Sequence, residues 1–337
     1  MKNATLADVA AYAGVSPAAV SYYFKKTKKL SRNLEQKLEE GARILRYTPI
    51  HSPNKPEPAP QIKQVNMCVI VENNDVRDDI YIFSMMNGVM DCLAEHEYQL
   101  SFNRLIVGDH KSRELFISGL DHSAGVILCN NRKGHCLEDE IKERQIPYVL
   151  LGSPEKAESD FYVDVDTQGV GFQATEHLLS REHRRILFLN LSEDMLQSQQ
   201  RREGFIFAHK QRGLEFNDAD HVFAPISAEI CCQIVKDYFK KDSAYTAVLT
   251  SNEIQAQGVI RALKELKMPV PSKVALISMG GTMLGALTVP SLTTIDFNPH
   301  KHGYEAARLL VDVLTKKRIQ PFHLILPGNL VERNSTK

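Results

Sequence analysis

Small and hydroxyl-bearing side chains are concentrated near the start of the chain and are followed directly by lysines. Small side chains allow a helix to approach another surface closely, while hydroxyl and ammonium groups donate hydrogen bonds to phosphate oxygens. This chemistry suits contact with a nucleic acid, whose charged backbone attracts cations. The candidate residues are Thr5, Ser16, Pro17, Ala18, Ala19, Ser21, Tyr22, Tyr23, Lys25, Lys26, Lys28 and Lys29.

Two short helices joined by a tight turn would position these groups. Thr5 can cap a first helix, with Asp8 in its first turn, and Gly14 permits the left-handed backbone that ends a helix. Ser16 and Pro17 are favourable residues for starting a second helix. This spacing indicates a helix-turn-helix, in which the second helix enters the major groove of DNA. An ordinary helical hairpin followed by a solvated lysine run is the alternative.

Charge supports a small DNA-directed head on a larger body. Residues 1–60 hold ten Lys and Arg against five Asp and Glu, whereas the whole chain holds 41 of each. The basic excess is therefore confined to the head. The chain opens without an apolar signal segment and has no apolar run long enough to span a membrane. We therefore expect a cytoplasmic protein that does not contact a membrane.

The chain divides by pattern into a head, a linker and a body. Residues 1–47 predict a three-helix head, and residues 48–62, with five prolines, predict an irregular linker. Residues 63–337 alternate apolar strands, such as 65–71, with amphipathic helices, such as 201–212. This pattern predicts an α/β fold with parallel sheets covered on both faces. The length favours two lobes, with a small-molecule site at the carboxyl ends of the strands.

Several motifs follow one another from the head to the end of the chain. The head reads TLADVAAYAGVSPAAVS. The body contains QGVGFQATEHLL after Asp166, HRRILFL, Arg201-x-x-Gly204-Phe205, AVLTSNE, VPSLTTID and a final ERNST. In this order and spacing, the motifs resemble the lactose-repressor (LacI/GalR) family of transcriptional regulators over nearly the whole chain.

The resemblance implies a helix-turn-helix head joined to a two-lobed effector domain like that of periplasmic binding proteins. It implies a homodimer that binds a near-palindromic operator in double-stranded DNA. A small-molecule effector, a sugar or related metabolite, would modulate the affinity for the operator. The implied first lobe comprises about residues 63–160 and 293–320, and the second lobe about residues 161–292 and 321–337.

In the head, the resemblance assigns base contacts to Pro17, Ala18, Ala19 and Tyr22, although Tyr22 stands where many relatives carry arginine. It assigns phosphate contacts to Thr5, Ser16, Ser21, Tyr23, Lys25, Lys26, Lys28 and Lys29. The linker departs from the family, because residues 50–56 lack the Asn-x-x-Ala-Arg-x-Leu hinge helix whose leucine enters the minor groove. We therefore expect that this linker does not kink DNA by that route.

For the effector site, the resemblance points to Tyr81, Arg201 and Asn252, with Glu253 in place of the usual aspartate beside Asn252. Gly280 occupies the place of a family aspartate that binds sugar hydroxyls. That loss leaves a different small molecule, a phosphorylated one or no effector as alternatives. Each residue also has a structural alternative: a core aromatic for Tyr81, a surface charge at a helix start for Arg201 and a turn former for Asn252.

Other signals favour neither a cofactor nor catalysis. Gly169-x-Gly171-x-x-Ala174 fits a dinucleotide-binding pattern, but three residues separate it from the preceding strand. His300 and His302 lack a third metal ligand nearby. The six cysteines form no CxxC pair and predict buried free thiols. We therefore expect no catalytic residue, cofactor or metal. A DNA-binding dimer with a ligand-free scaffold domain regulated by a protein partner, and an enzyme with an incidental helical head, are the alternative functions.

Overall fold

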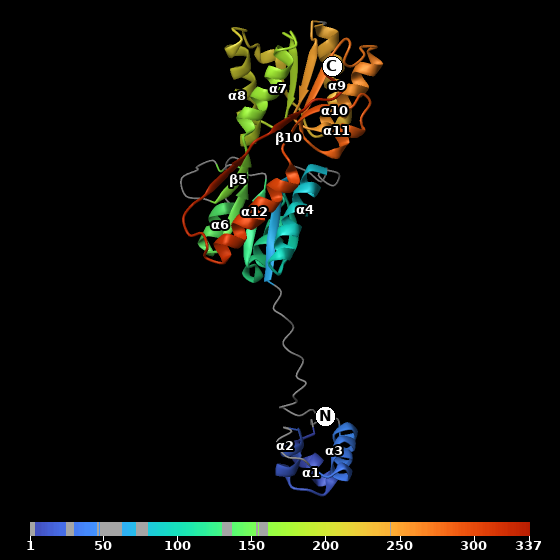
Figure 1. Cartoon of the computed structure of the whole chain (residues 1–337), viewed down its shortest axis with the longest axis vertical. Coiled ribbons are helices and arrows are strands. Elements are labelled where there is room, and N and C mark those ends of the chain that lie inside the picture. Colours follow the sequence, from blue (N-terminus) through green and yellow to red (C-terminus); the bar gives the residue numbers. More distant parts are fainter. Residues whose placement is uncertain are drawn as a thin grey trace. The chain divides into compact units, whose positions relative to one another are not determined.

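The computed structural model divides into two compact units, residues 1–62 and residues 63–337 (Figure 1). The expected linker, residues 48–62, and the candidate lysines between residues 25 and 29 lie outside the described residues, so their roles stay predictions. Within the described part of the chain, no helix is long and apolar enough to cross a membrane. The structure describes residues 4–24, 30–45, 47, 63–71, 80–129, 137–152, 154, 161–242 and 244–337.

The first unit is a head of three helices around a small core. Val9, Val20 and Leu38 are fully buried, so each helix contributes one side chain to the centre of this core. The arrangement agrees with the predicted three-helix head. The helices are α1 (Leu6–Ala13), α2 (Pro17–Phe24) and α3 (Arg32–Ile44).

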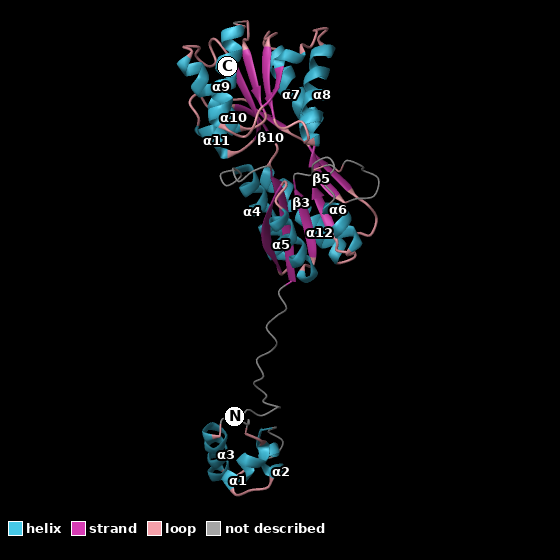
Figure 2. Cartoon of the chain, turned by 180° about the vertical axis from the view of Figure 1, so that it is seen from behind, coloured by secondary structure: helices cyan, strands magenta, loops and turns pink. Residues whose placement is uncertain are grey.

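The second unit begins with a lobe built on a six-stranded parallel sheet flanked by helices (Figure 2). Alternate residues of its first strand belong to different cores: Met67 and Val69 pack on one face, and Cys68 and Ile70 on the other. Burial on both faces is typical of a parallel sheet and agrees with the predicted fold class. In sheet order the strands are β11 (His323–Leu326), β5 (Tyr162–Val165), β4 (Tyr148–Leu151), β3 (Gly125–Cys129), β1 (Lys63–Val71) and β2 (Tyr98–Ile106). The helices are α4 (Ile80–Glu95), α5 (His110–Gly119), α6 (Leu137–Glu143) and α12 (Pro299–Leu314), with a 3-10 turn at Leu120–His122.

A second lobe repeats this arrangement. Leu187 and Leu189 of β6 face one core, and Ile186 and Phe188 face the other. Strand β12 runs antiparallel to its neighbour, and the other pairings are parallel. In sheet order the strands are β12 (Asn329–Val331), β10 (Thr293–Asp296), β9 (Ala275–Gly280), β8 (Ala247–Thr250), β6 (Ile186–Asn190) and β7 (His221–Phe223). The helices are α7 (Thr167–Leu179), α8 (Leu196–Gln211), α9 (Ala228–Lys241), α10 (Glu253–Glu265) and α11 (Met283–Leu287), with a 3-10 turn at Asp218–Asp220.

The chain passes between the lobes at positions that differ from the expected ones. Strand β5 belongs to the first sheet, although the expected second lobe begins at residue 161. Strand β10 belongs to the second sheet, although the expected first lobe resumes at residue 293, and β11 belongs to the first sheet, although residues from 321 were expected in the second. Each place where the chain passes between the lobes lies next to one of these strands. The strand that a crossing strand pairs with, rather than its own sequence, decides which sheet it joins.

Helices α4 and α12 of the first lobe pack closely against each other. A Cβ atom on Gly88 of α4 would overlap the backbone of His300, and one on Gly303 of α12 would overlap the backbone of Met85. The two helix backbones therefore touch at both glycines, with no room for a side chain between them. Because protein interiors are close-packed, this contact fixes the two helices relative to each other. It thereby also positions the other side chains that they carry.

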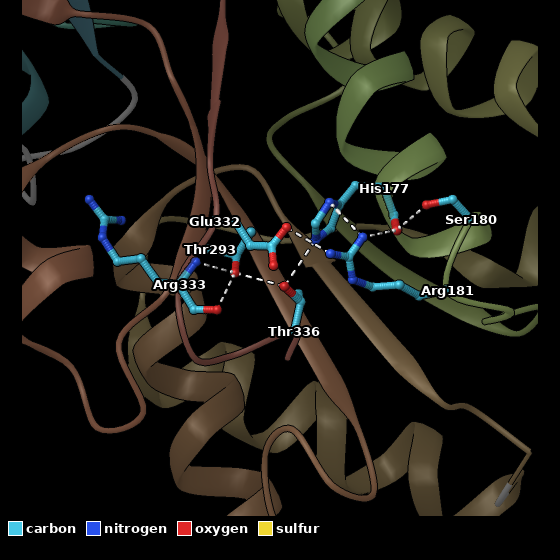
Figure 3. A network of polar contacts seen from close by, with 7 residues as sticks. All are labelled: His177, Ser180, Arg181, Thr293, Glu332, Arg333 and Thr336. Atoms are coloured by element: carbon cyan, nitrogen blue, oxygen red, sulfur yellow. Dashed lines mark hydrogen bonds and ion pairs between the residues drawn. The ribbon is translucent and has the colours of Figure 1, made fainter.

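A polar network joins the end of the chain to α7 and β10 (Figure 3). The hydroxyl of Thr336 lies 2.9 Å from His177 Nε2 and 2.8 Å from Thr293 Oγ1. Arg181 Nη2 donates a hydrogen bond to Glu332 Oε2 at 2.7 Å, and Arg181 Nη1 lies 3.2 Å from His177 Nδ1. Each of these polar side chains has a partner inside the lobe, so the network holds the final ERNST segment against the second sheet.

The described cysteines are buried free thiols, as predicted. Burial raises the pKa of Cys68 to about 12, so this thiol stays protonated at neutral pH. Cys136 lies outside the described residues. The buried thiols are Cys68, Cys92, Cys129, Cys231 and Cys232.

Candidate DNA-binding and effector sites

The second helix of the head presents one accessible face. Pro17, Ala18 and Tyr22 are exposed, while the opposite face of α2 packs into the head core. The hydroxyl of Ser16 accepts a hydrogen bond from the backbone N–H of Ala19 at 3.3 Å, which caps the helix. The structure therefore brings the expected base-contacting residues onto one small surface. The exposed or half-buried members of this surface are Ser16, Pro17, Ala18, Ala19, Ser21 and Tyr22.

Thr5 and Tyr23, two expected phosphate contacts, form hydrogen bonds within the head. The Asp8 carboxylate accepts hydrogen bonds from the backbone N–H and the hydroxyl of Thr5, both at 2.7 Å, at the start of α1. Gly14 ends α1 at φ 68° in the left-handed conformation. The hydroxyl of Tyr23 donates to Glu39 Oε1 at 2.6 Å, and burial together with this carboxylate raises the pKa of Tyr23 to about 12. Tyr23 therefore joins α2 to α3.

A cavity in the second unit is lined by all four expected effector residues. Tyr81 comes from α4 in the first lobe. Arg201 comes from α8, Asn252 from the turn before α10 and Gly280 from the end of β9, all in the second lobe. The carboxyl ends of β5 and β9 reach this cavity, which is where α/β sheets bind small molecules. Residues far apart in the sequence thus meet at one place between the lobes.

Arg201 is the central cation of the cavity. Helix α8 begins at Leu196, earlier than expected, so Arg201 lies within the helix and is 8% exposed rather than a surface charge at a helix start. Its Nε and Nη1 atoms are buried and have no hydrogen-bond partner among the described residues. The guanidinium carbon lies 5.7 Å from the centre of the Phe297 ring. A buried guanidinium with unsatisfied N–H groups is costly unless a ligand supplies acceptors.

Glycines between α7 and α8 hold Arg201 in this position. A Cβ atom on Gly171 would overlap the backbone of Arg201, and one on Gly204 would overlap the backbone of α7. The Asp166 carboxylate accepts a hydrogen bond from the backbone N–H of Gly169 at 2.9 Å and caps α7. The glycines that fit a dinucleotide-binding pattern in the sequence therefore serve helix capping and close helix packing in the structure.

The first lobe contributes a tyrosine, a histidine and a carboxylate to the cavity. The hydroxyl of Tyr81 lies 3.4 Å from His302 Nδ1, and His302 Nε2 lies 3.0 Å from the carbonyl oxygen of Val163. A carbonyl oxygen only accepts, so Nε2 carries the proton. Burial lowers the pKa of His302, although the charge of Asp164 opposes this shift. His300 instead contacts a carboxylate of α4, so the two histidines do not converge on one point.

The start of α10 brings an amide and a second carboxylate to the cavity. Asn252 Oδ1 accepts a hydrogen bond from the backbone N–H of Gln255 at 2.9 Å, while Asn252 Nδ2 is buried without a partner among the described residues. Glu253 Oε1 accepts hydrogen bonds from the backbone N–H groups of Gly281 at 2.9 Å and Thr282 at 3.1 Å. Burial raises the pKa of Glu253 to about 6, although these hydrogen bonds oppose the shift.

Gln197 and Asp164 line the cavity but are not among the residues predicted from the sequence, and Glu253 is noted there only as a replacement for the usual aspartate. Gln197 lies one helical turn before Arg201, and its buried Oε1 has no partner among the described residues. Its amide lies against Gly152 of the first lobe, where a side chain would collide with it. The spacing of four residues places Gln197 and Arg201 on one helix face, a signal that was available in the sequence. Glu253 directly follows Asn252 in the AVLTSNE motif. No local signal reveals Asp164, because its place in the lining depends on the pairing of β5 within the first sheet.

Comparison with known proteins gives matches over both units. Residues 5–49 match "Bacterial regulatory proteins, lacI family", and residues 175–336 match "Periplasmic binding protein-like domain". The HTH-type transcriptional regulator CelR of Thermobifida fusca is 25% identical over 99% of this chain and 98% of its own length. The ribose operon repressor of Escherichia coli (strain K12) is 25% identical over 98% of this chain and 99% of its own length.

A solved structure has a similar fold over nearly the whole chain. The structure of a transcriptional regulator CelR–cellobiose complex superposes with a TM-score of 0.74 at 25% identity, covering 98% of this chain and 99% of that chain. The match to this structure extends over both units of the chain. The chain therefore has a LacI-family helix-turn-helix domain and a periplasmic-binding-protein-like domain, and its homologues are LacI-family transcriptional regulators.

Proposed function

We propose that the protein is a homodimeric repressor whose affinity for a near-palindromic operator changes when an uncharged sugar or related metabolite binds between its lobes. The observation that carries the proposal is the set of unsatisfied polar atoms around Arg201. Among the described residues, this set includes the donors Nε and Nη1 of Arg201 and Nδ2 of Asn252 and the acceptor Oε1 of Gln197. A hydroxyl group both donates and accepts hydrogen bonds, so a hydroxyl-rich ligand satisfies this mixed set.

The charges around the cavity favour an uncharged ligand. Arg201 is a cation, whereas Asp164 and Glu253 place two carboxyl groups in the same lining. A phosphorylated sugar carries close to two negative charges. Its phosphate would meet one guanidinium and two carboxylates, so its burial would be poorly compensated. The complex of the relative CelR with cellobiose supports a neutral sugar as the effector class.

Ligand binding at this place would change the relation between the lobes. Tyr81 and Asp164 belong to the first lobe, and Arg201 and Asn252 belong to the second, so one ligand contacts both. A ligand that binds one arrangement of the lobes more tightly shifts the population toward it. In a dimer that reads two half-sites about one helical turn apart, such a shift alters how well both heads engage DNA. We place this activity in the cytoplasm, where operator DNA is accessible.

Isothermal titration calorimetry on the full-length protein tests the effector class. The probes are cellobiose, ribose and further uncharged mono- and disaccharides, together with glucose 6-phosphate. We expect binding of at least one uncharged sugar and loss of that binding in Arg201→Ala. Arg202→Ala is the matched control, because its neighbouring guanidinium pairs with Asp218 outside the cavity. Binding of the sugar phosphate without binding of any uncharged sugar would contradict the proposal.

Selection of bound sites from a randomised duplex library tests the DNA interaction. We expect a palindrome with two half-sites, and an affinity for that site that falls steeply as salt concentration rises. Adding the sugar found by calorimetry should change the affinity for the selected site. Recovery of sequences without a common motif would contradict sequence-specific binding by the head.

A further inference from the structure

Glu253 brings a buried charge to the cavity wall at a position where an uncharged side chain would serve the fold. Its side chain is 3% exposed, and it forms no ion pair within the described part of the chain. Its carboxylate accepts hydrogen bonds from the backbone N–H groups of Gly281 and Thr282. A glutamine would accept the same two bonds without the cost of burying a charge. The charge therefore needs a further explanation.

Gly280 leaves open the space that this carboxylate occupies. A Cβ atom on Gly280 would lie 2.7 Å from Oε2 and 3.2 Å from Oε1 of Glu253, too close for any side chain to coexist with the carboxylate in place. The backbone of Gly280 has φ 135°, a conformation that residues with a side chain rarely adopt. Both residues line the cavity. The missing side chain at residue 280 and the carboxylate of residue 253 are thus complementary in shape.

We propose that Glu253 is the acidic effector-binding residue of this cavity, that its carboxylate accepts a hydrogen bond from an effector hydroxyl, and that Gly280 is the residue that admits it. The inference rests on the proposed sugar-binding function. Arg201 and Asn252 supply donors in the same lining, so Glu253 completes the set with a charged acceptor. Hydrogen bonds to an ionised acceptor are stronger than those to a neutral one. A site built in this way discriminates against analogues that lack the hydroxyl.

Two variants test the assignment by calorimetry with the uncharged sugar that the wild-type protein binds. Glu253→Gln keeps the size of the side chain and its backbone contacts but removes the charge. We expect its affinity to fall by about 10- to 100-fold. Gly280→Ala should also lower the affinity, because the added Cβ displaces the carboxylate, and thermal unfolding checks that this variant is folded. Glu229→Gln is the matched control, since Glu229 also lies in the first turn of a helix but pairs with Arg261 on the surface.

Deoxy analogues of that sugar identify the hydroxyl group involved. One deoxy analogue should bind the wild-type protein and Glu253→Gln with equal affinity, because without that hydroxyl group the charge of the acceptor no longer contributes to binding. The affinity of the wild-type protein for the parent sugar should also fall as the pH decreases through about 6, where Glu253 becomes protonated. The affinity of Glu253→Gln should not show this fall with pH. The other ionisable residues of the lining, Arg201, Asp164, His302 and Tyr81, are retained in the variant.

The outcomes separate the two proposals. An uncharged sugar that binds the wild-type protein and Glu253→Gln with the same affinity would overturn the assignment of Glu253 and leave the effector class intact. A wild-type protein that binds no uncharged sugar would overturn both, because the assignment rests on that class. Loss of affinity in Glu229→Gln as well would show that the effect is not specific to the cavity carboxylate.

Discussion

Two polar clusters of the second lobe use similar residues in opposite ways. In the carboxyl-terminal network, Arg181 has both Glu332 and His177 as partners, and the hydroxyl of Thr293 contacts a side chain and the backbone (Figure 3). Around Arg201, by contrast, two N–H groups of the guanidinium have no partner among the described residues. An unsatisfied buried polar group costs about 1–3 kcal/mol.

This difference in hydrogen bonding distinguishes a cluster that stabilises the fold from one that can bind a ligand. A cluster whose members satisfy one another stabilises the fold and needs nothing further. A buried cation that the fold leaves unsatisfied is a preformed place for a ligand. A ligand-free scaffold domain would gain nothing from the cavity around Arg201, so the comparison favours an effector-binding domain.

Removing the unsatisfied cation should produce the largest effect. In Arg201→Met we expect the affinity for the effector to fall by more than about 100-fold, because the donors that hold its hydroxyl groups are lost. The free energy of unfolding should stay unchanged or increase, since a buried charge without a partner is replaced by an apolar side chain of similar length. Titration calorimetry and urea denaturation measure the two quantities. A large loss of stability would instead assign Arg201 a structural role.

Breaking the carboxyl-terminal network should have the opposite effect: lower stability and unchanged affinity for the effector. Thr293 is fully buried, accepts a hydrogen bond from the backbone N–H of Arg333 at 3.0 Å and lies 2.8 Å from the Thr336 hydroxyl. Thr293→Val removes the acceptor of the Arg333 N–H and one of the two side-chain contacts of the Thr336 hydroxyl, so we expect a loss of about 2 kcal/mol in the free energy of unfolding with unchanged effector affinity. The control is Thr315→Val, whose exposed hydroxyl contacts carbonyl groups of its own helix. Equal losses in the two variants would contradict this reading of the network.

Acidification should weaken the same network through His177. Burial and the charge of Arg181 lower the pKa of His177 from 6.5 to about 4. The unfolded chain therefore takes up a proton below about pH 6.5 while the folded protein does not, so the stability that is present above this pH is lost as the pH falls toward 4. Between about pH 7 and pH 5 we expect His177 to account for roughly 1–2 kcal/mol of this loss.

Urea denaturation at several pH values measures the effect, with His177→Gln as the comparison. The variant retains polar atoms that can reach Thr336 but does not titrate, so its stability should depend less on pH. Other histidines with lowered pKa, such as His221, are common to both proteins and cancel in the difference. Identical pH profiles would show that His177 is not the group responsible.

The smallest expected effect concerns Asn252, which combines a structural hydrogen bond with a donor at the cavity. Its Oδ1 caps α10, whereas its Nδ2 at the cavity has no partner in the part of the chain that the structure describes. Asn252→Ser keeps a good cap and removes the donor, so we expect a loss of about 1 kcal/mol in effector binding and little change in stability. Asn252→Ala should lose stability as well. Calorimetry and denaturation on the two variants separate the roles, and equal stabilities would show that the cap contributes little.

Local signals predicted much of the fold. The caps at Thr5, Gly14 and Ser16 delimit the helices of the head, and the predicted strand over residues 65–71 lies within β1. Strand β2 was missed because its side chains are largely half-buried or exposed and so form no continuous apolar run. The lobe boundaries were displaced because pairing with a neighbour, rather than local pattern, decides which sheet a crossing strand joins.

The features of the candidate sites likewise divide into those that the sequence predicts and those that depend on the tertiary structure. The sequence by itself determined the helix-turn-helix and the α/β class, because caps and periodicity act between residues close along the chain. The candidates Tyr81, Arg201, Asn252 and Gly280 came from the resemblance of its motifs to a known family. Only the tertiary structure decided that Arg201 is buried with two nitrogen atoms that have no hydrogen-bond partner among the described residues, and that the Glu253 carboxylate occupies the space beside Gly280. These facts depend on the packing of α7 on α8 and on the loop after β9, which bring together groups that are distant in sequence.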